Sequence, residues 1–549
     1  MLTWQQIWRG VQTVAVPILL SLALNYFVGK SKDKPPPPSL YLPILNEIGF
    51  VPRTFPVTYR ADAPEFEDYE RVKNVTTGTP DTTAVLLNWA RFPNVLLITS
   101  LLCGPWLDDT IAQVVIWNNN PTHLTFKDFE YTGCTKDKLK IHNAPGNMYF
   151  QGRFFACAGA STPYCFIQDD DYLIRPEIIQ TLRARIARTK EPHAIHLLPP
   201  HEHLSSTLRE IHVPKPDDSY LSDIHTSFAW LGHGTIMHRT KAEEFLTLLR
   251  LLRLSSDEMK MADNYFTILS NRVPEVWFDQ DFGLGGGSAF TVGEEGNERN
   301  AKHIYRATQY LDSVARCGAA SCDFTVDDVK KTKRTKVPYT LLGAHPPPAS
   351  WTRAPCSGAT CVLETNIKLL PDTMKHTSDS ITNMLSLEAE NLEVLGEAGR
   401  QHYQDYPLSH AVDTHVKTAF QSFGNAQKGD VMSLDILADI SEAHEWQAVE
   451  MVWLVNADTE KILQASVFES SIDTEHWRGA SQRPVCESTN MEDPMASSET
   501  KIYLHECSVQ MVIASNALSL RATGRLFRVR LLEDMTEHWT VYEIWMRGL

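Results

Sequence analysis

With 549 residues, the chain is too long to fold around one hydrophobic core, so we expect two or three domains. Its net charge of −16 is spread unevenly, because residues 365–549 hold 14 Lys and Arg against 28 Asp and Glu and leave a balance of only −2 for residues 1–364. A nucleic-acid-binding protein would show a basic face, and this composition therefore excludes nucleic acid as an expected partner.

The N-terminal segment is apolar over 18 residues, from about Val11 to Val28. This length is at the short end of what spans a bilayer, and no small-residue cleavage site follows, so we predict an uncleaved signal-anchor within residues 1–34. A buried helix of a soluble domain is the alternative. The proline run Lys34–Pro38 predicts a stiff stem, assigned with the entry segment to residues 35–80. The glycosylation sequon at 74–76 would be used only in the secretory lumen.

Short apolar runs alternate with helical segments from about residue 83 onward. Runs at 84–89 and 112–118 have the length and composition of strands, and a helical pattern at 94–102 lies between them. This order predicts a βαβ unit of an α/β fold, whose ligands sit at the carboxyl ends of the strands. The polar residues expected in that crevice are Asn88, Arg91 and Asn118. No GxGxxG and no Walker loop occurs, which disfavours Rossmann dehydrogenases and P-loop kinases.

A strand-length apolar run, Tyr164–Gln168, leads directly into three carboxylates, Asp169, Asp170 and Asp171. Like charges side by side repel one another unless a cation lies among them, and carboxylate oxygens suit Mg²⁺ or Mn²⁺ better than Zn²⁺. An ion of this kind can carry a diphosphate. A solvated acidic turn or a helix N-cap is the simpler alternative.

Four pieces of this region, in this order, resemble the exostosin-like glycosyltransferases of the GT-A fold: AVLLNWARFPNV, VVIWNNNP, an RF pair at Arg153 and IQDDDYL. Arg153 stands sixteen residues before Asp169, a spacing that agrees with the family. The resemblance covers about residues 80–310 and is closest to enzymes that transfer N-acetylhexosamines from UDP-sugars with retention of configuration. The chain departs from the family in having Gly152 where the family has Asn.

The resemblance implies a role for each of the matched residues. Asp169 and Asp171 would hold Mn²⁺ (or Mg²⁺) on the nucleotide diphosphate, and Asp170 would face the ribose or the sugar. Arg153 would contact the nucleotide or a phosphate. Near the uridine the resemblance places Asn88 and Arg91.

A second carboxylate is expected further along the chain, because the sugar acquires positive charge as UDP departs. The resemblance implies that Asp263, which opens the apolar run 263–269, orients the acceptor hydroxyl or stabilises the transition state. Helix N-capping by Asp263 is the alternative explanation. A second phosphate contact is implied downstream, where the candidates are Arg299, His303 and Arg306.

Two other patterns between these motifs are open to a functional or a structural interpretation. The segment from Asp223 to His238 is typical of a strand, and its Gly232 and Gly234 would let the backbone approach a ligand, or mark a bulge in the core. Four nearby histidines do not form an evident metal site, because two prolines break any helical spacing between them, and a loop with solvated side chains is expected. They are His193, His196, His201 and His203.

The ten cysteines include two C-x4-C pairs, Cys317 with Cys322 and Cys356 with Cys361. Zinc sites more typically have tighter spacing and histidines nearby, so we expect disulfides, with the connectivity open. Disulfides imply an oxidising compartment.

The composition turns to Pro, Ala and Gly near residue 338, which suggests a domain boundary. We therefore expect a GT-A domain at 81–337, a linker at 338–389 and a further domain at 390–549. The last domain has β-rich runs at 446–455, 461–468, 510–514 and 526–532, a pattern typical of an all-β sandwich. The stretches AVDTHVKTAFQSFGNAQKGDVMSLDI and RLFRVRLLEDMTEHWTVYEIWMRG resemble the discoidin or coagulation-factor C-type sandwich, which implies a sugar- or lipid-binding accessory.

Together these features predict a membrane-anchored, Mn²⁺-dependent glycosyltransferase that moves a sugar, by resemblance an N-acetylhexosamine, from a UDP-sugar to a glycan or glycoprotein. Its expected location is the Golgi or endoplasmic reticulum membrane, with one membrane span and a lumenal catalytic domain. The alternative is a catalytically inactive carbohydrate-binding or scaffold protein. The intact acidic triplet is evidence against this alternative, because an inactive protein would be expected to lose it. A metal-dependent phosphodiesterase or hydrolase would need further Asp or His clusters on neighbouring strands, and the sequence pattern does not reveal them.

Overall fold

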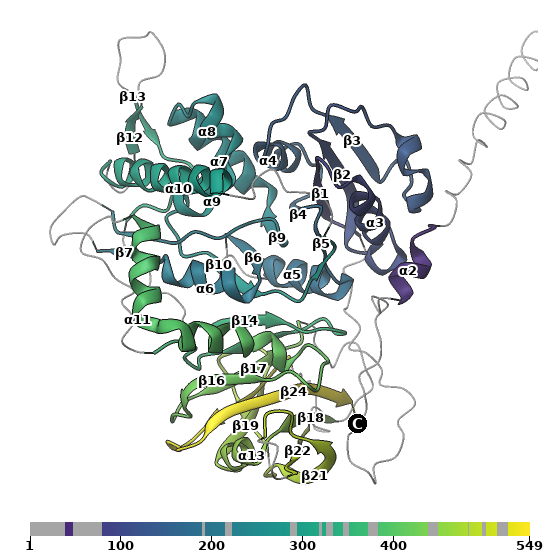
Figure 1. Ribbon diagram of the computed structural model, residues 1–549, viewed down its shortest axis with the longest axis vertical. Coiled ribbons are helices and arrows are strands. Elements are labelled where there is room, and N and C mark those ends of the chain that lie inside the picture. Colours follow the sequence, from purple (N-terminus) through teal and green to yellow (C-terminus); the bar gives the residue numbers. More distant parts are fainter. Residues whose placement is uncertain are drawn as a thin grey trace, which may run out of the picture.

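The computed structural model describes residues 39–47, 79–188, 193–214, 222–285, 294–317, 321–324, 333–343, 351–371, 383–437, 448–480, 482–496, 501–512 and 525–548 (Figure 1). The predicted signal-anchor and the sequon lie outside these residues, as does most of the predicted stem. Within the described ranges, no helix is both long and apolar enough to cross a membrane.

A sheet centred on β1 (Thr82–Asn88) forms the first half of the fold. β1 pairs in parallel with β2 (Ile111–Asn118) on one side and with β4 (Tyr164–Gln168) on the other. β3 (Leu139–Asn143) lies parallel to β2 at the edge. The carboxyl ends of these four parallel strands therefore meet at one edge of the sheet, as the sequence predicted for the first two.

The sheet continues on the far side of β4 with mixed polarity. β9 (Thr235–His238) runs antiparallel to both β4 and β6 (Ala194–Leu198), and β10 (Glu275–Phe278) is parallel to β6. A separate two-stranded ribbon, β5 (Tyr172–Leu173) with β11 (Phe282–Gly283), follows directly after the acidic triplet. This is a mixed α/β arrangement rather than a purely parallel one.

Helices cover both faces of this sheet, because the strand side chains alternate between two hydrophobic clusters. Val85 and Leu87 of β1 pack with one set of helices, and Ala84 and Leu86 pack with the other. The first set is α4 (Gln151–Ala158), α7 (Arg239–Leu251), α9 (Asp263–Leu269) and α10 (Glu294–Ala315). The second set is α3 (Phe92–Leu102) and α5 (Pro176–Arg188).

The expected linker, 338–389, contributes strands that join the two halves of the molecule. β14 (Thr352–Pro355) pairs in parallel with β10, and β15 (Val362–Thr365) runs back antiparallel to β14 and then pairs with β17 (Val431–Asp435). One sheet of thirteen strands therefore runs through both halves, in the order β20-β19-β23-β17-β15-β14-β10-β6-β9-β4-β1-β2-β3.

Among the described residues from Phe420 onward, the C-terminal region consists of strands and the helix α13 (Ala457–Gln464), and it packs two sheets face to face. One layer is the end of the thirteen-stranded sheet, with β23 (Leu526–Leu531), β19 (Ser466–Ser471) and β20 (Arg478–Gly479) beyond β17. The other layer has five strands: β16 (Phe420–Asn425), β24 (His538–Gly548), β18 (Ala448–Val455), β22 (Tyr503–Val512) and β21 (Val485–Glu492). The remaining elements are α2 (Leu42–Glu47), α6 (Pro200–Leu208), α8 (Ser256–Lys260), α11 (Met384–Asp405), and the ribbons β7 (Ile211–Val213) with β8 (Ile224–Thr226) and β12 (Ser321–Phe324) with β13 (Lys333–Lys336).

Two strand predictions are wrong in part. The run 461–468 begins inside helix α13, because the Asn456 side chain accepts a hydrogen bond from the Thr459 backbone at 2.9 Å and starts a helix there. Only the last three residues of that run belong to β19. In the segment 223–238, two short strands form instead of one, β8 (Ile224–Thr226) and β9 (Thr235–His238), and the chain between them turns around Gly232 and Gly234.

The prediction of a loop with solvated histidines is wrong for His196, His203 and the segment around Pro200, whereas His201 is exposed. Pro200 occupies the first turn of α6 and starts this helix instead of breaking it, because its fixed φ suits that position. His203 is buried in α6, stacked on Phe278 and hydrogen-bonded to the Tyr403 hydroxyl at 2.9 Å. His196 is buried in β6, and burial lowers the pKa of both imidazoles to about 4. Both are therefore core residues.

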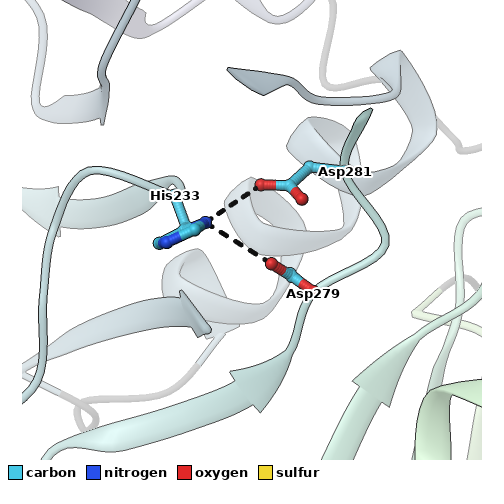
Figure 2. A group of neighbouring side chains, drawn as sticks. All are labelled: His233, Asp279 and Asp281. Atoms are coloured by element: carbon cyan, nitrogen blue, oxygen red, sulfur yellow. Dashed lines mark hydrogen bonds and ion pairs between the residues drawn. The ribbon is translucent and has the colours of Figure 1, made fainter. Parts of the chain in front are cut away.

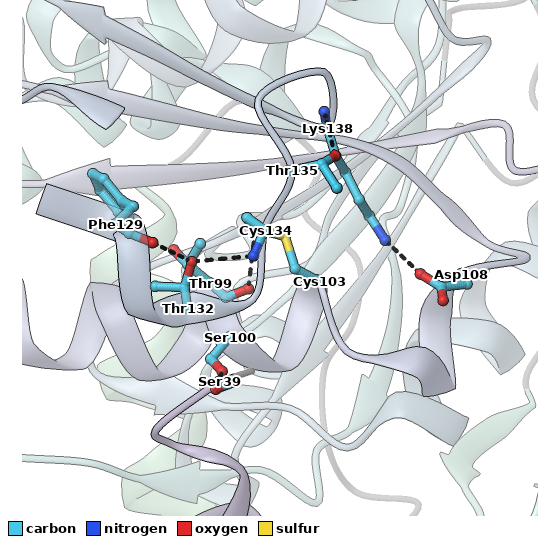
Figure 3. Close-up of a disulfide and its surroundings, with 10 residues drawn as sticks. All are labelled: Ser39, Thr99, Ser100, Cys103, Asp108, Phe129, Thr132, Cys134, Thr135 and Lys138. Atoms are coloured by element: carbon cyan, nitrogen blue, oxygen red, sulfur yellow. Dashed lines mark hydrogen bonds and ion pairs between the residues drawn. A yellow bond between two sulfur atoms is a disulfide. The ribbon is translucent and has the colours of Figure 1, made fainter. Parts of the chain in front are cut away.

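All ten cysteines form disulfides, and the two expected C-x4-C pairs are confirmed. The five bridges are Cys103–Cys134, Cys157–Cys165, Cys317–Cys322, Cys356–Cys361 and Cys486–Cys507. Figure 3 shows the first of them, which ties the end of α3 to the loop after residue 132. In that loop the Cys134 backbone donates to Thr132 Oγ1 at 3.4 Å, and the nearby Lys138 pairs with Asp108 at 3.1 Å.

A buried ion-pair group holds the two halves together across β15 and β17. Asp435 has no exposed side-chain surface and accepts from Arg525 at 2.6 Å and from Arg185 at 3.2 Å. Arg185 comes from α5 and also pairs with Glu364 of β15 at 2.8 Å. The α/β sheet and the sandwich are therefore joined by buried ion pairs as well as by backbone hydrogen bonds.

We predict that Asp435→Ala lowers the free energy of unfolding by about 3 kcal/mol, because it leaves two arginines beside a buried gap without their carboxylate. Urea denaturation of the full chain measures this change. Asp458→Ala, an exposed carboxylate on α13, is the matched control and should change stability by less than about 0.5 kcal/mol. Equal effects of the two substitutions would contradict a linking role for Asp435.

Candidate functional site

The acidic triplet lies where β4 ends, at the edge at which the carboxyl ends of β1 and β2 also lie. The Asp169 backbone donates to the Gly232 carbonyl at 2.9 Å, which fixes the start of the triplet against the turn before β9. A Cβ on Gly232 would meet the Asp169 carboxylate, so a larger residue there would require that side chain to move. The sequence predicted that the backbone at the glycine pair approaches a ligand or bulges. In the structure, the group close to Gly232 is the Asp169 carboxylate of the protein itself.

Arg153 connects the triplet to Asp263. Its guanidinium has no exposed surface and pairs with Asp169 Oδ1 at 2.6 Å and with Asp263 Oδ2 at 2.9 Å. These three residues come from α4, from the end of β4 and from α9. The structure therefore brings together three residues that the sequence analysis had placed in one site from separate motifs.

Asp263 does not cap its helix. The N-cap of α9 is Ala262, and no side-chain hydrogen bond caps it, so the capping explanation is wrong. The Asp263 carboxylate is 2% exposed and faces Arg153 instead. Burial, with a further contribution from Asp169, outweighs Arg153 and raises the pKa of Asp263 to about 7.

Arg91 neutralises the other end of the triplet. Its Nη1 lies 2.9 Å from Asp170 Oδ1 and 3.0 Å from Asp171 Oδ2. Asn94 supports the same turn, donating to the Asp170 carbonyl at 2.8 Å. Burial and the neighbouring carboxylates still raise the pKa of Asp170, and they raise that of Asp171 to about 6.

The charges of this group do not balance. Four carboxylates face two arginines, which leaves two negative charges when all four are ionised. Asp171 Oδ1 is buried without a hydrogen-bond partner, and carboxylate oxygens of this kind are ligands that Mn²⁺ and Mg²⁺ accept. The residues therefore fit a divalent cation, which would supply the missing charge.

The two asparagines predicted for the crevice lie together behind this site. Asn88 donates to Asn118 Oδ1 at 2.7 Å, and Asn118 donates to Asn143 Oδ1 at 2.8 Å. These bonds join the ends of β1, β2 and β3 in one row. Arg299 lies on α10 with its guanidinium 5.8 Å from the centre of the Tyr149 ring, and the triplet's arginine contacts come from Arg91 and Arg153.

A second ionisable group lies beside the triplet, and the sequence analysis missed it (Figure 2). His233 Nδ1 lies 3.5 Å from Asp279 Oδ2 and 3.4 Å from Asp281 Oδ2, while His233 Nε2 lies 3.4 Å from Glu202 Oε2. Burial lowers the pKa of His233, but the surrounding carboxylates outweigh burial and raise it to about 11. His233, Asp279 and Asp281, two carboxylates and one imidazole, have the donor atoms for a metal ion.

A signal for this group was present in the chain. Asp279 and Asp281 follow a buried strand, β10, in the same way that the triplet follows β4. The hydrolase class was set aside because such a cluster on a neighbouring strand was not evident, and that premise is wrong. His233 itself gave no signal, because its partners come from α6 and from beyond β10.

Comparisons with known proteins give limited similarity. No family model matches the chain, and no curated protein matches it. Among solved structures, a mannosyltransferase from Pyrobaculum calidifontis in complex with GDP-Man and Mn²⁺ is similar over 49% of this chain and 70% of its own, with 12% identity and a TM-score of 0.28. TarS from S. aureus in complex with UDP-GlcNAc covers 43% of this chain and 72% of its own, with 17% identity and a TM-score of 0.26.

The sandwich has similar structures of another kind. A carbohydrate-binding module of Clostridium perfringens, CpGH89CBM32-5, in complex with GalNAc-β-1,3-galactose, covers 26% of this chain and 82% of its own, with 12% identity and a TM-score of 0.16. Similarities at these values assign no function to this protein.

The raised pKa values of Asp263 and Asp171 predict a pH dependence of stability. Burial raises them from 3.8 to about 7 and about 6, so the folded chain holds more protons than the unfolded chain between about pH 4 and pH 7. In metal-free buffer the free energy of unfolding should therefore fall as the pH rises through this window. Urea denaturation at stepped pH, with EDTA present, measures the slope.

Asp263→Asn removes one of these two protonation sites, so its slope over the same window should be shallower. Relative to wild type, the variant should gain about 2 to 4 kcal/mol between pH 4 and pH 7. Asp257→Asn, an exposed carboxylate on α8, is the control and should keep the wild-type slope. An unchanged slope in Asp263→Asn would mean that this carboxylate is ionised throughout.

Proposed function

We propose that this protein is a metal-dependent glycosyltransferase that moves a sugar from a UDP-sugar to a glycan or glycoprotein acceptor. The single observation that carries the proposal is the group Asp169–Arg153–Asp263 with Asp170, Asp171 and Arg91, in which four carboxylates face two arginines at a carboxyl-terminal strand edge. Nucleotide-sugar transfer needs such a place, because a diphosphate leaving group must be bound and stabilised by a cation. The N-acetylhexosamine donor and retention of configuration are proposed from the exostosin-like resemblance alone.

In this proposal Asp169 and Asp171 hold the cation, which acts as a Lewis acid toward the diphosphate of the departing nucleotide. Arg91 and Arg153 keep the carboxylates oriented, and their hydrogen bonds to Asp170 and Asp169 set which oxygens remain for a ligand. Arg153 also holds Asp263, so the charge of Asp263 acts on the site through this guanidinium.

The sandwich is proposed as a carbohydrate-binding accessory, and the N-terminal segment as the anchor in the Golgi or endoplasmic reticulum membrane. The five disulfides support a lumenal location, because structural disulfides persist in oxidising compartments. Both assignments are inferences from sequence patterns and from disulfide chemistry.

A catalytically inactive binding protein on the same folds is the second candidate, and one observation favours it. Arg91 and Arg153 already pair with three of the six carboxylate oxygens of the triplet. This is the arrangement expected if the two arginines permanently take the place of a metal ion. A hydrolase with a two-metal centre is disfavoured, since its ions lie about 4 Å apart, whereas Asp281 and the triplet stand at opposite ends of the β5–β11 ribbon.

The first test changes the triplet. Asp169→Asn with Asp171→Asn should abolish Mn²⁺-dependent binding of UDP-sugars, because amide groups do not supply the charge that the ion needs. A thermal-shift screen of UDP-sugars with and without Mn²⁺ measures binding to the folded chain. Asp108→Asn, a partly exposed carboxylate on the same domain, should bind like wild type. Undiminished binding by the double variant would exclude the triplet as the donor site.

The second test separates catalysis from binding. Asp263→Asn should lower kcat for transfer or donor hydrolysis by about 100-fold and should weaken Mn²⁺–UDP binding much less than the triplet double variant does, because Asp263 is not among the residues proposed to hold the cation. Single-turnover rates and calorimetric titrations give the two numbers. Wild-type protein that binds donor and Mn²⁺ without any turnover would favour the inactive binding protein.

A further inference from the structure

The group around His233 has the arrangement of a metal-ligating histidine. Nδ1 faces Asp279 and Asp281 on one side of the ring, and Nε2 faces Glu202 on the other. A carboxylate at one ring nitrogen fixes the tautomer and leaves the other nitrogen free to bind a metal, as is common behind metal-bound histidines. Glu202 therefore stands where a carboxylate behind such a ligand is expected, and the two aspartates stand where its fellow ligands are expected.

The spacing of the three donor atoms suits one ion. His233 Nδ1 and the two aspartate oxygens all lie within 4.8 Å of one another, and the two N–O separations are 3.4 and 3.5 Å. Ligands at about 2.1 to 2.2 Å from a metal stand about 3 to 3.5 Å apart when they are neighbours in its shell. These three atoms could therefore occupy neighbouring positions in the shell of one ion, with water in the remaining positions.

Burial raises the free energy of the His233 group when no metal ion is bound. The side chains of His233 and Asp281 are each 7% exposed, and Asp279 Oδ2 and Glu202 Oε2 are buried without a hydrogen-bond partner. Three carboxylates against one imidazolium leave an excess of negative charge in a place with little water. Buried charges that are not matched cost several kcal/mol, and a cation offsets that cost.

We propose that His233, Asp279 and Asp281 form a second divalent-cation site, separate from the acidic triplet, with Glu202 holding the imidazole from behind. One imidazole nitrogen with two carboxylates suits a transition-metal ion such as Mn²⁺ better than Mg²⁺ or Ca²⁺, which prefer an all-oxygen shell. The proposal does not depend on the glycosyltransferase assignment.

The site is separate because of the β5–β11 ribbon. Gly283 pairs with Tyr172 and Phe282 with Leu173, so Asp281 leaves the ribbon at the end opposite to Asp171. The backbone positions of Asp171 and Asp281 are thus three residues apart along the ribbon, about 10 Å. The ring of Tyr172, which directly follows Asp171 in the chain, lies against His233 with 3.9 Å between the ring centres.

An ion here would steady the triplet. His233 directly follows Gly232, whose carbonyl accepts the hydrogen bond from the Asp169 backbone. Asp281 directly precedes β11, and the Leu284 backbone donates to the Asp171 carbonyl at 2.7 Å. A metal that joins His233 to Asp281 would therefore clamp both segments that hold the triplet in place. His233 and Asp281 are positioning residues in this account.

The test uses the full-length chain with Mn²⁺ and no nucleotide. Pulsed electron paramagnetic resonance should detect nitrogen coupled to bound Mn²⁺ in wild type, because the triplet offers only oxygen. The signal should persist in Asp169→Asn with Asp171→Asn and vanish in His233→Gln. His201→Gln, an exposed histidine that also neighbours Glu202, is the matched control and should keep the signal.

Two results would overturn the proposal. Wild type without nitrogen coupling at saturating Mn²⁺ would mean that no ion sits on His233, and this reading needs no variant to fold. Loss of the coupling in the triplet double variant would mean one shared site instead of two. Glu202→Gln should keep the nitrogen signal but bind Mn²⁺ 10- to 100-fold more weakly, and unchanged affinity would remove Glu202 from its supporting role.

Hydrogen exchange tests separately whether the ion joins the segments around His233 and Asp281. In the triplet double variant, Mn²⁺ should slow amide hydrogen exchange in residues 231–234 and 282–284, since these segments join through the ion. The same background with Asp281→Asn added should show no Mn²⁺ effect there. Exchange in these segments that is indifferent to Mn²⁺ while the nitrogen signal is present would refute the clamp. Failure of UDP-sugar binding in wild type would leave these results untouched, so the two proposals are tested separately.

Discussion

The candidate site depends on one fully buried guanidinium. Arg153 lies between Asp169 and Asp263 with no exposed surface, and a buried arginine must keep its charge because it does not lose its proton in proteins. Because the buried guanidinium must be neutralised, the Asp169 and Asp263 carboxylates are held beside it. Helix α4, the end of β4 and helix α9 are fixed relative to one another by this requirement, and the triplet inherits its orientation from it.

The second constraint is the continuity of the sheet. Because β14 extends the α/β sheet and β15 passes it on to β17, the sandwich is an extension of the same backbone hydrogen-bond network. Asp435 and Arg185 add a buried charge contact across that passage. The triplet follows β4, three strands away from β10 in the sheet order, whereas Asp279 and Asp281 flank Gln280, which donates to the Pro355 carbonyl at the junction.

The triplet and the His233 group, which lie on one edge of the sheet, share an excess of negative charge. The triplet and the His233 group each collect more negative charge than the nearby cations of the chain neutralise, and the short ribbon β5–β11 joins them. Excess negative charge in a buried place is held by protons or by metal ions. The raised pKa values of Asp171 and Asp263 express the first of these, and cation binding would be the second.

The sequence by itself determined the local elements and the chemistry of the triplet. Strand-length apolar runs at β1, β2 and β4 and the carboxylates after β4 are properties of contiguous residues, and the sequence indicated disulfides while leaving their pairing to the structure. Only the tertiary structure decided that Asp263 faces Arg153 instead of capping α9, that His203 is a core residue, and that His233 meets Asp279, Asp281 and Glu202. The reason is physical: a side chain's partners across a sheet come from elements far away in the chain, and burial, which sets their charge, exists only once those elements pack.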